Sequence, residues 1–276
     1  MVEYITYHYW ELFMYALIVA SVVAIIYFLN VKRNRYKVAF YFSYIFYKLG
    51  LIRRISSKYM SIVHAKECNE PLVELIKHPK IILNNDTIEE PVLLRKGVAI
   101  RIYNVADSLP DNQYLKLYSA FRSRVKLYEV WKKEVEKVTA DNPGLGKAEL
   151  LTLVNSNVVN PNQNMGGHDT GAAVDVAICD KDGNDIDFGS KYHERYNSKN
   201  LTQEQKENRK MLRKIMKSQK FVNNPNQWWH FSYGDRSWAT YKGKRMGAIY
   251  AAAEKEFERI GFVRVVKTET KTPNIK

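Results

Sequence analysis

The longest charge-free, mostly apolar run of the chain lies near its amino end, from Leu12 to Leu29. As a helix, this run would extend about 27 Å, which is close to the hydrocarbon thickness of a bilayer. No Lys or Arg precedes the run and no small-residue cleavage motif follows it, which argues against a signal peptide. The pattern predicts a transmembrane helix in an amino-terminal anchor over residues 1–31.

A basic flank follows this run directly, formed by Lys32, Arg33, Arg35 and Lys37. The positive-inside rule then predicts a single-pass membrane protein whose main domain is cytoplasmic, with membrane lipid as a partner. The shorter apolar stretch 38–52 predicts an amphipathic helix at the membrane surface, within a juxtamembrane segment over 32–70. Two alternatives stay open. Residues 38–52 could cross as the second arm of a hairpin, which would turn the main domain outward, or residues 12–29 could form a buried helix of a soluble domain.

Beyond residue 70, the apolar positions switch between strand and helix spacing. The stretches "VAIRIYN" (98–104) and "YLKLYSAF" (114–121) alternate as strands do, whereas 122–138 repeats its apolar residues at helical spacing. The stretch "AAVDVAI" (172–178) predicts a strand with Asp175 on the face opposite its valines.

A capping box marks the start of a further helix. Thr202 and Gln205 have the T-x-x-Q spacing of this motif, and they precede a helical apolar stripe that runs to about Lys217. Mixed strands and helices without a repeating βαβ rhythm predict an α+β domain over 71–266, followed by a tail over 267–276.

Composition and charge narrow the partners. Lys and Arg outnumber Asp and Glu by 43 to 29, a formal charge of +14 that would suit a polyanion. Much of the excess follows the apolar run, and no basic run is interleaved with aromatic residues, so no nucleic-acid partner is expected. Cys68 and Cys179 are the two cysteines, and they lack C-x-x-C spacing, which excludes a disulfide framework and a cysteine zinc site.

Three segments carry candidate chemistry. In "GGHDTGAAVD", glycines on both sides of His168 allow the loop to fold back toward Asp175. With His230 of "QWWHFSY", these residues would form a His, Asp, His set that leaves the fourth position of a catalytic zinc open. Arg122 of "YSAFRS" closes an apolar strand, as a surface charge or as a group that stabilises an oxyanion. By spacing alone, the better interpretation is that these are ordinary polar residues and that Arg122 is a surface charge.

Taken in order, "SAFR", "GGHDTGAAVD" and "QWWH" resemble the motifs of the D-alanyl-D-alanine dipeptidase family, the VanX-type zinc D,D-peptidases, over roughly residues 90–240. The resemblance implies a zinc D,D-peptidase-like domain with a central antiparallel sheet, flanking helices and one Zn²⁺ per chain. It implies that His168, Asp175 and His230 are the zinc ligands. It also implies that Arg122 polarises the scissile carbonyl and that Asp187 of "DIDFGSKYHE" lies near the substrate's ammonium group.

One position departs from the family, because Gln227 stands where the general-base glutamate is expected. Glutamine cannot shuttle a proton, and general acid–base catalysis is typically worth about a hundredfold to ten-thousandfold. The base is not a ligand, so zinc binding does not require it.

Three hypotheses follow. The first is a membrane-anchored zinc D,D-dipeptidase or carboxypeptidase acting on D-Ala-D-Ala or peptidoglycan-derived peptides, impaired or using another acid such as Asp169 or Glu194. The alternative is a catalytically silent, zinc-containing module that binds D-Ala-D-Ala or another small peptide. The third, a structural domain with a decayed site, gives no reason for retaining three ligands and Arg122.

Overall fold

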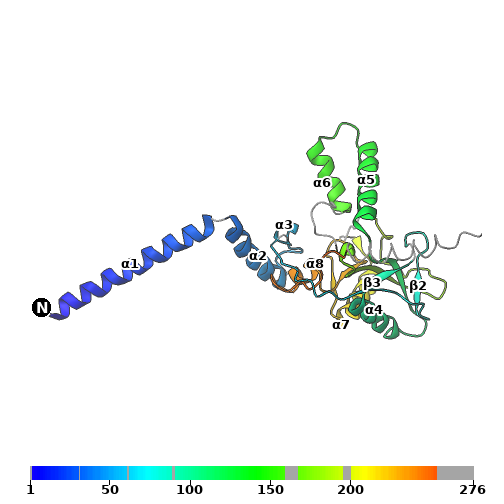
Figure 1. Cartoon of the computed structure of the whole chain (residues 1–276), viewed down its shortest axis with the longest axis horizontal. Coiled ribbons are helices and arrows are strands. Elements are labelled where there is room, and N and C mark those ends of the chain that lie inside the picture. Colours follow the sequence, from blue (N-terminus) through cyan, green and yellow to red (C-terminus); the bar gives the residue numbers. More distant parts are fainter. Residues whose placement is uncertain are drawn as a thin grey trace, which may run out of the picture. The chain divides into compact units, whose positions relative to one another are not determined.

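The chain forms two compact units, Met1–Ile62 and Val63–Lys276, in a computed structural model that describes residues 2–30, 32–60, 62–88, 91–158, 167–194 and 200–253. The first unit is helical, with α1 (Val2–Asn30), α2 (Lys32–Lys48) and α3 (Ser57–Met60) (Figure 1). The boundaries expected after residues 31, 70 and 266 remain predictions, and the tail over 267–276 lies outside the described residues.

The prediction of a single-pass membrane protein is wrong. Across the described residues, no helix has both the length and the apolar character that a membrane crossing demands. The transmembrane helix, the membrane localisation with its sidedness, and lipid as a partner are therefore not retained.

A five-stranded sheet organises the second unit, in the order β2–β4–β5–β7–β6. Its strands are β2 (Ile81–Leu83), β4 (Tyr114–Ser119), β5 (Ala173–Cys179), β6 (Val222–Asn223) and β7 (His230–Ser232). The pair β2–β4 is parallel and the other pairs are antiparallel, so the sheet is mixed rather than antiparallel as predicted. A separate antiparallel pair joins β1 (Leu72–Glu74) to β3 (Leu93–Arg95). The α+β class is confirmed.

Helix α4 (Lys96–Asp107) occupies the stretch 98–104 that was predicted to be a strand. Its buried side chains are Val98, Ala99, Ile102, Val105 and Ala106, a spacing that lines one face of a helix. The strand prediction for this stretch is wrong. An alternating pattern would bury Ile100 together with Val98 and Ile102, whereas Ile100 is 49% exposed.

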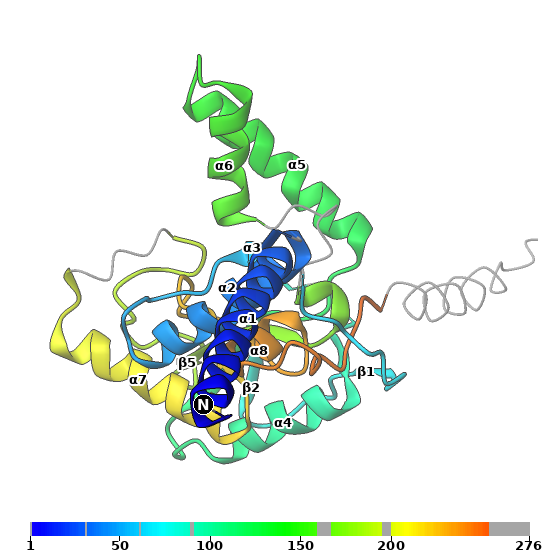
Figure 2. The same ribbon diagram turned by 90° about the vertical axis from the view of Figure 1, so that its left-hand side faces the viewer.

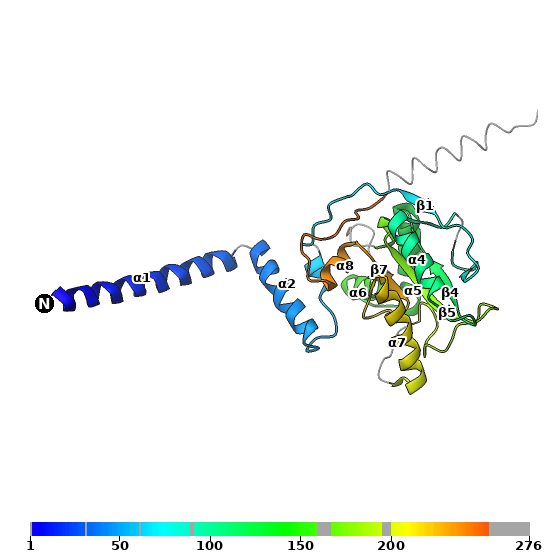
Figure 3. The ribbon, with the colours of Figure 1, turned by 90° about the horizontal axis from the view of Figure 1, so that it is seen from below.

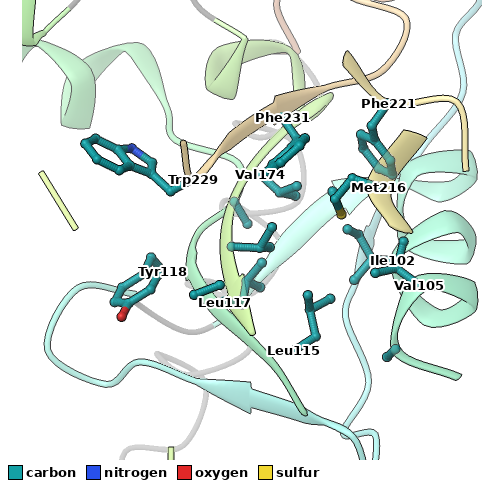
Figure 4. Packing of buried hydrophobic residues seen from close by; sticks show 14 of the residues in the cluster. Ile102, Val105, Leu115, Leu117, Tyr118, Val174, Met216, Phe221, Trp229 and Phe231 are labelled. Atoms are coloured by element: carbon teal, nitrogen blue, oxygen red, sulfur yellow. The ribbon is translucent and has the colours of Figure 1, made fainter. Parts of the chain in front are cut away.

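The core lies on both sides of β5, all seven residues of which are buried. Figure 4 shows Ile102 of α4 and Met216 of α7 (Gln203–Ser218) on one side of the sheet, with Tyr118 and Trp229 on the other. Helix α4 packs against β4 (Figure 3). The capping box of Thr202 and Gln205 is confirmed at the start of α7 (Gln203–Ser218). Val174 and Val176 of β5 belong to the hydrophobic core, and Asp175 between them points to the opposite face of the sheet, as predicted.

A helical arm separates two of the candidate segments. Helices α5 (Arg124–Asp141) and α6 (Lys147–Asn157) pack side by side and stand away from the sheet (Figure 2). The chain leaves the sheet after Arg122 to form this arm. Arg122 N donates to His168 O at 3.1 Å, so the residue before the arm contacts His168, which follows it in the sequence. The short helix α8 (Arg236–Tyr241) follows β7.

Candidate metal centre

The first candidate ligand, His168, opens a single 3₁₀ turn, η2 (His168–Thr170). Gly171 ends this turn with φ +69°, a left-handed conformation that glycine adopts without strain, and the chain then enters β5. The imidazole Nδ1 lies 2.7 Å from the carbonyl oxygen of Ala120. A carbonyl only accepts, so Nδ1 donates its proton to it, and Nε2 is the ring nitrogen that remains to face Asp175.

Strand register brings the other two candidates together. Asp175 of β5 pairs with His230 of β7, and it pairs with Ser119 of β4 on its other side. Residues directly opposite on neighbouring strands present their side chains to the same face. His230 Nδ1 accordingly lies 2.8 Å from Asp175 Oδ1, while His168 Nε2 lies 3.4 Å from that same oxygen.

The pKa values of Asp175 and His230 are shifted by their contacts within the cluster. Burial raises the pKa of the Asp175 carboxyl, but the charges and hydrogen bonds of His168 and His230 outweigh burial and hold this pKa well below its usual range. Burial lowers the pKa of His230, yet the hydrogen bond and charge of Asp175 outweigh it, and the net shift is upward. A carboxylate that stays ionised between two imidazoles is a strong attractor for a cation.

The donor set fits a metal ion. One ligand atom each from His168, Asp175 and His230 lie within 4.8 Å of one another. Two imidazole nitrogens and one carboxylate oxygen are the ligand types of catalytic zinc sites, and several other divalent metals would accept them too. The hydrogen bond of His168 to a backbone carbonyl is the outer contact that typically orients a metal-binding imidazole. These three residues could therefore hold a metal ion.

Arg122 lies beside this cluster. Its Nη2 donates to the Ser119 hydroxyl at 2.9 Å, which fixes the guanidinium at the end of β4. Its charge acts on His230 and also on Tyr192. The structure thus brings Arg122 together with the three candidate ligands.

Gln227 lies in the turn that leads into β7, and its side chain is half-buried. Its amide oxygen accepts a hydrogen bond from Asn224 Nδ2 at 2.8 Å. The turn is closed by Asn223 Nδ2, which donates to the backbone oxygen of Gln227 at 2.9 Å. The side chain is therefore held by its neighbour three residues earlier.

Asp187 is placed differently from the other candidates. Its Oδ1 accepts from Gly189 N at 2.7 Å and its Oδ2 accepts from Gln205 Nε2 at 2.9 Å. The hydrogen bond from Gln205 is the main reason that the pKa of Asp187 is lowered. These contacts tie the carboxylate to the capping box of α7, and among the described residues none of its hydrogen bonds joins it to the metal cluster.

Sequence reasoning assigned no role to Tyr192, whose hydroxyl donates to Asp175 Oδ2 at 2.9 Å. Burial raises the pKa of this phenol well above its usual value, so it stays a donor. The ring also stacks on Tyr118 with centroids 4.3 Å apart. A loop tyrosine 17 residues from Asp175 carries no local periodicity signal that could have identified it.

Comparisons with known proteins agree with these motifs. A family model described as D-ala-D-ala dipeptidase, of the M15 peptidases, matches residues 91–246. A D-alanyl-D-alanine dipeptidase of Synechocystis sp. is 28% identical over 221 residues, covering 65% of this chain and 88% of that protein.

Two solved structures are also similar in part. They are a variant of the vancomycin-resistance D,D-pentapeptidase VanY in complex with Zn(II), and VanYB in complex with D-alanine-D-alanine. Each is 15% identical with a TM-score of 0.40 and covers 67% of this chain; 96% of the first and 93% of the second are covered.

Proposed function

Because the chain belongs to the D-Ala-D-Ala dipeptidase family of M15 peptidases, we propose that it is a zinc D,D-peptidase that holds one Zn²⁺ and hydrolyses D-Ala-D-Ala or a peptide ending in it. The observation that carries the proposal is the convergence of His168, Asp175 and His230, whose ligand atoms lie within 4.8 Å, next to the guanidinium of Arg122. Metal ligands and a fixed cation gathered on the inner strands of one sheet suit the polarisation of a peptide carbonyl.

The chain's own residues have separate tasks in this mechanism. A zinc ion held by the three ligands supplies the Lewis acidity that makes water nucleophilic near neutral pH. Tyr192 donates to the second oxygen of Asp175, which leaves the first oxygen facing both imidazoles. Arg122, held by Ser119, donates to the carbonyl oxygen of the scissile peptide and stabilises the negative charge that develops there.

Proton transfer is the step for which this site lacks the expected residue, a general-base glutamate at position 227. Gln227 can orient water through hydrogen bonds but cannot accept a proton, and its amide oxygen is already bonded to Asn224. Of the two acids that could replace it, Asp169 is buried, with 4% of its surface exposed. Glu194 is exposed, and its Oε2 accepts from Lys191 N at 2.9 Å. We therefore propose slow turnover, lower than with a glutamate at residue 227 by up to the usual contribution of general acid–base catalysis.

The second candidate function is a binding module that holds zinc and captures D-Ala-D-Ala without cleaving it. Gln227 is the observation that favours it, because this substitution removes the proton carrier and leaves the ligands in place. Both candidates share the same metal site and the same peptide chemistry, and they differ only in turnover.

The test combines metal analysis with a hydrolysis assay on the full chain. Plasma mass spectrometry of the purified protein should give about one zinc per chain, and His168→Ala should reduce it strongly. Release of D-alanine from D-Ala-D-Ala, and from a longer peptide with the same end, should depend on that zinc. A protein without zinc would contradict both candidates. Zinc with calorimetric peptide binding but no release of D-alanine would favour the binding module.

A further inference from the structure

Two buried polar residues lie behind the metal cluster. Ser232 ends β7 and Asp235 precedes α8, and each is 1% exposed. Ser232 is two residues after His230 on the same strand, so both side chains point to the same face of the sheet. Burying a hydroxyl and a carboxyl here costs free energy unless each makes hydrogen bonds.

Their contacts form a chain that ends on a candidate ligand. Ser232 Oγ lies 3.4 Å from His230 Nε2, the ring nitrogen that does not face Asp175. The Asp235 carboxyl lies close to the Ser232 side chain, and its buried Oδ2 has no hydrogen-bond partner within the described residues, so it is an acceptor open to the Ser232 hydroxyl. Asp235 Oδ1 accepts from Trp238 N at 2.7 Å, which caps α8 and fixes the carboxyl group.

The same pair supports the other histidine segment. Gly167 directly precedes His168, and a Cβ atom at this glycine would lie 2.5 Å from Asp235 Oδ2 and 3.3 Å from Ser232 Oγ. The backbone leading to His168 therefore packs against the Ser232–Asp235 pair without room for a side chain. One buried polar pair thus contacts the segments of two candidate ligands that are 62 residues apart in the chain.

We propose that Ser232 and Asp235 are positioning residues that orient His230 for metal binding. His230 Nε2–H donates to Ser232 Oγ, and the Ser232 hydroxyl donates to Asp235, so each hydrogen bond in the chain has one donor and one acceptor. With the remaining ring proton on Nε2, Nδ1 presents its lone pair on the side of Asp175 and His168. The inference rests on the proposed function, because it assigns the outer contacts of the proposed zinc site.

The two histidines would then be held in complementary ways. His168 has its Nδ1 proton fixed by the Ala120 carbonyl and offers Nε2, whereas His230 has its Nε2 proton fixed by Ser232 and offers Nδ1. Outer contacts of this kind fix the tautomer and the ring orientation, and their loss typically weakens metal affinity by about 10- to 100-fold.

A purely structural role predicts a different outcome. Asp235 Oδ1 caps α8 without help from the Ser232 hydroxyl, so loss of that hydroxyl should leave the helix start intact. Thr240 provides a matched control, because it is 0% exposed and its hydroxyl donates within α8, to Arg236 O at 2.8 Å. A general effect of removing a buried hydroxyl would appear in Thr240→Val as well.

The experiment measures the zinc Kd of the full chain by competition with a chromophoric chelator, for wild type, Ser232→Ala, Ser232→Thr, Asp235→Asn and Thr240→Val. Near-ultraviolet circular dichroism checks that each variant is folded, and the visible spectrum of the Co²⁺-loaded protein reports ligand geometry. We expect Ser232→Ala to weaken zinc binding by about 10- to 100-fold and to change the Co²⁺ spectrum. The zinc Kd of Ser232→Thr, which retains a hydroxyl, and that of Thr240→Val should stay within about threefold of wild type. Asp235→Asn should bind zinc more weakly, because its amide nitrogen cannot accept a hydrogen bond from Ser232.

The outcomes separate this inference from the proposed function. If folded Ser232→Ala binds zinc as wild type does, the positioning role is overturned and the zinc site stands. Equal losses in Ser232→Ala and Thr240→Val would also overturn it. If Ser232→Ala does not fold, Asp235→Asn decides, and wild-type affinity in that variant refutes the hydrogen-bond chain. A wild-type chain that takes up no zinc refutes the proposed function and this inference together.

Discussion

Restoring a carboxylate at residue 227 is the sharpest test of how this site handles protons. In Gln227→Glu, one carboxylate oxygen can keep the hydrogen bond from Asn224 Nδ2, now 2.8 Å long, and the other oxygen becomes available for proton transfer. The turn itself should persist, because Asn223 bonds the backbone oxygen of residue 227 and not its side chain. The substitution therefore changes the chemistry of one atom with little demand on the fold.

The expected gain follows from the missing step. General acid–base catalysis contributes about 10²- to 10⁴-fold, which corresponds to roughly 2.7–5.5 kcal/mol of transition-state stabilisation. The added charge is tolerable because the side chain is half-buried rather than enclosed. We expect kcat/KM for D-Ala-D-Ala to rise within this range, with the zinc content unchanged.

The assay compares the zinc-loaded wild type with Gln227→Glu and Gln227→Ala by measuring D-alanine release across pH. The glutamate variant should show a new acidic limb in its pH profile, while the alanine variant should gain nothing. Folded, zinc-loaded Gln227→Glu with wild-type kcat/KM would refute the reasoning, because it would mean that another group already transfers the proton. An inert wild type with an active Gln227→Glu would favour the binding module as the natural function.

Three further predictions concern the metal, the thiols and the core. Zinc affinity should fall as the pH is lowered through the raised pKa of His230, because a proton and the metal compete for Nδ1; pH-independent affinity between pH 5 and 8, measured by chelator competition, would contradict this. Burial raises the pKa of the Cys179 thiol to about 12, so a disulfide reagent at pH 8 should modify Cys68 quickly and Cys179 only after denaturation; two fast thiols in the folded protein would be the opposing result. Leu117→Ala, at a fully buried position of β4, should lower the free energy of unfolding by about 2–5 kcal/mol in urea titrations. Ile100→Ala, at an exposed position, should change it by about 0.5 kcal/mol or less. Equal effects of the two substitutions would contradict the assignment of Leu117 to the core and of Ile100 to the surface.

Some features were readable from sequence because their causes are local. The capping box at Thr202 and Gln205 depends on groups three residues apart, and the alternation around Asp175 depends on the pleat of one strand. The family motifs that contain His168, Asp175 and His230 are short and ordered along the chain, so their resemblance to the zinc D,D-peptidases was visible without coordinates.

Other expectations failed because local pattern underdetermines structure. The residues 98–104 satisfy both a strand and a helix pattern, and the choice was made by packing against the sheet, which buried Val98 and Ile102 and left Ile100 in solvent. The apolar run near the amino end suggested a membrane span from its composition, but α1 does not meet the requirements of a crossing within its described residues.

By itself, the sequence determined the class of fold, the family and the identity of the candidate ligands, since these are carried by residue types at short spacing. Tertiary structure decided the geometry of the site. The pairing of Asp175 with His230 joins residues 55 apart, and the Ser232–Asp235 pair contacts the glycine before His168 across a longer separation. Such contacts depend on strand register and buried packing among distant segments, and no periodicity within one segment encodes them.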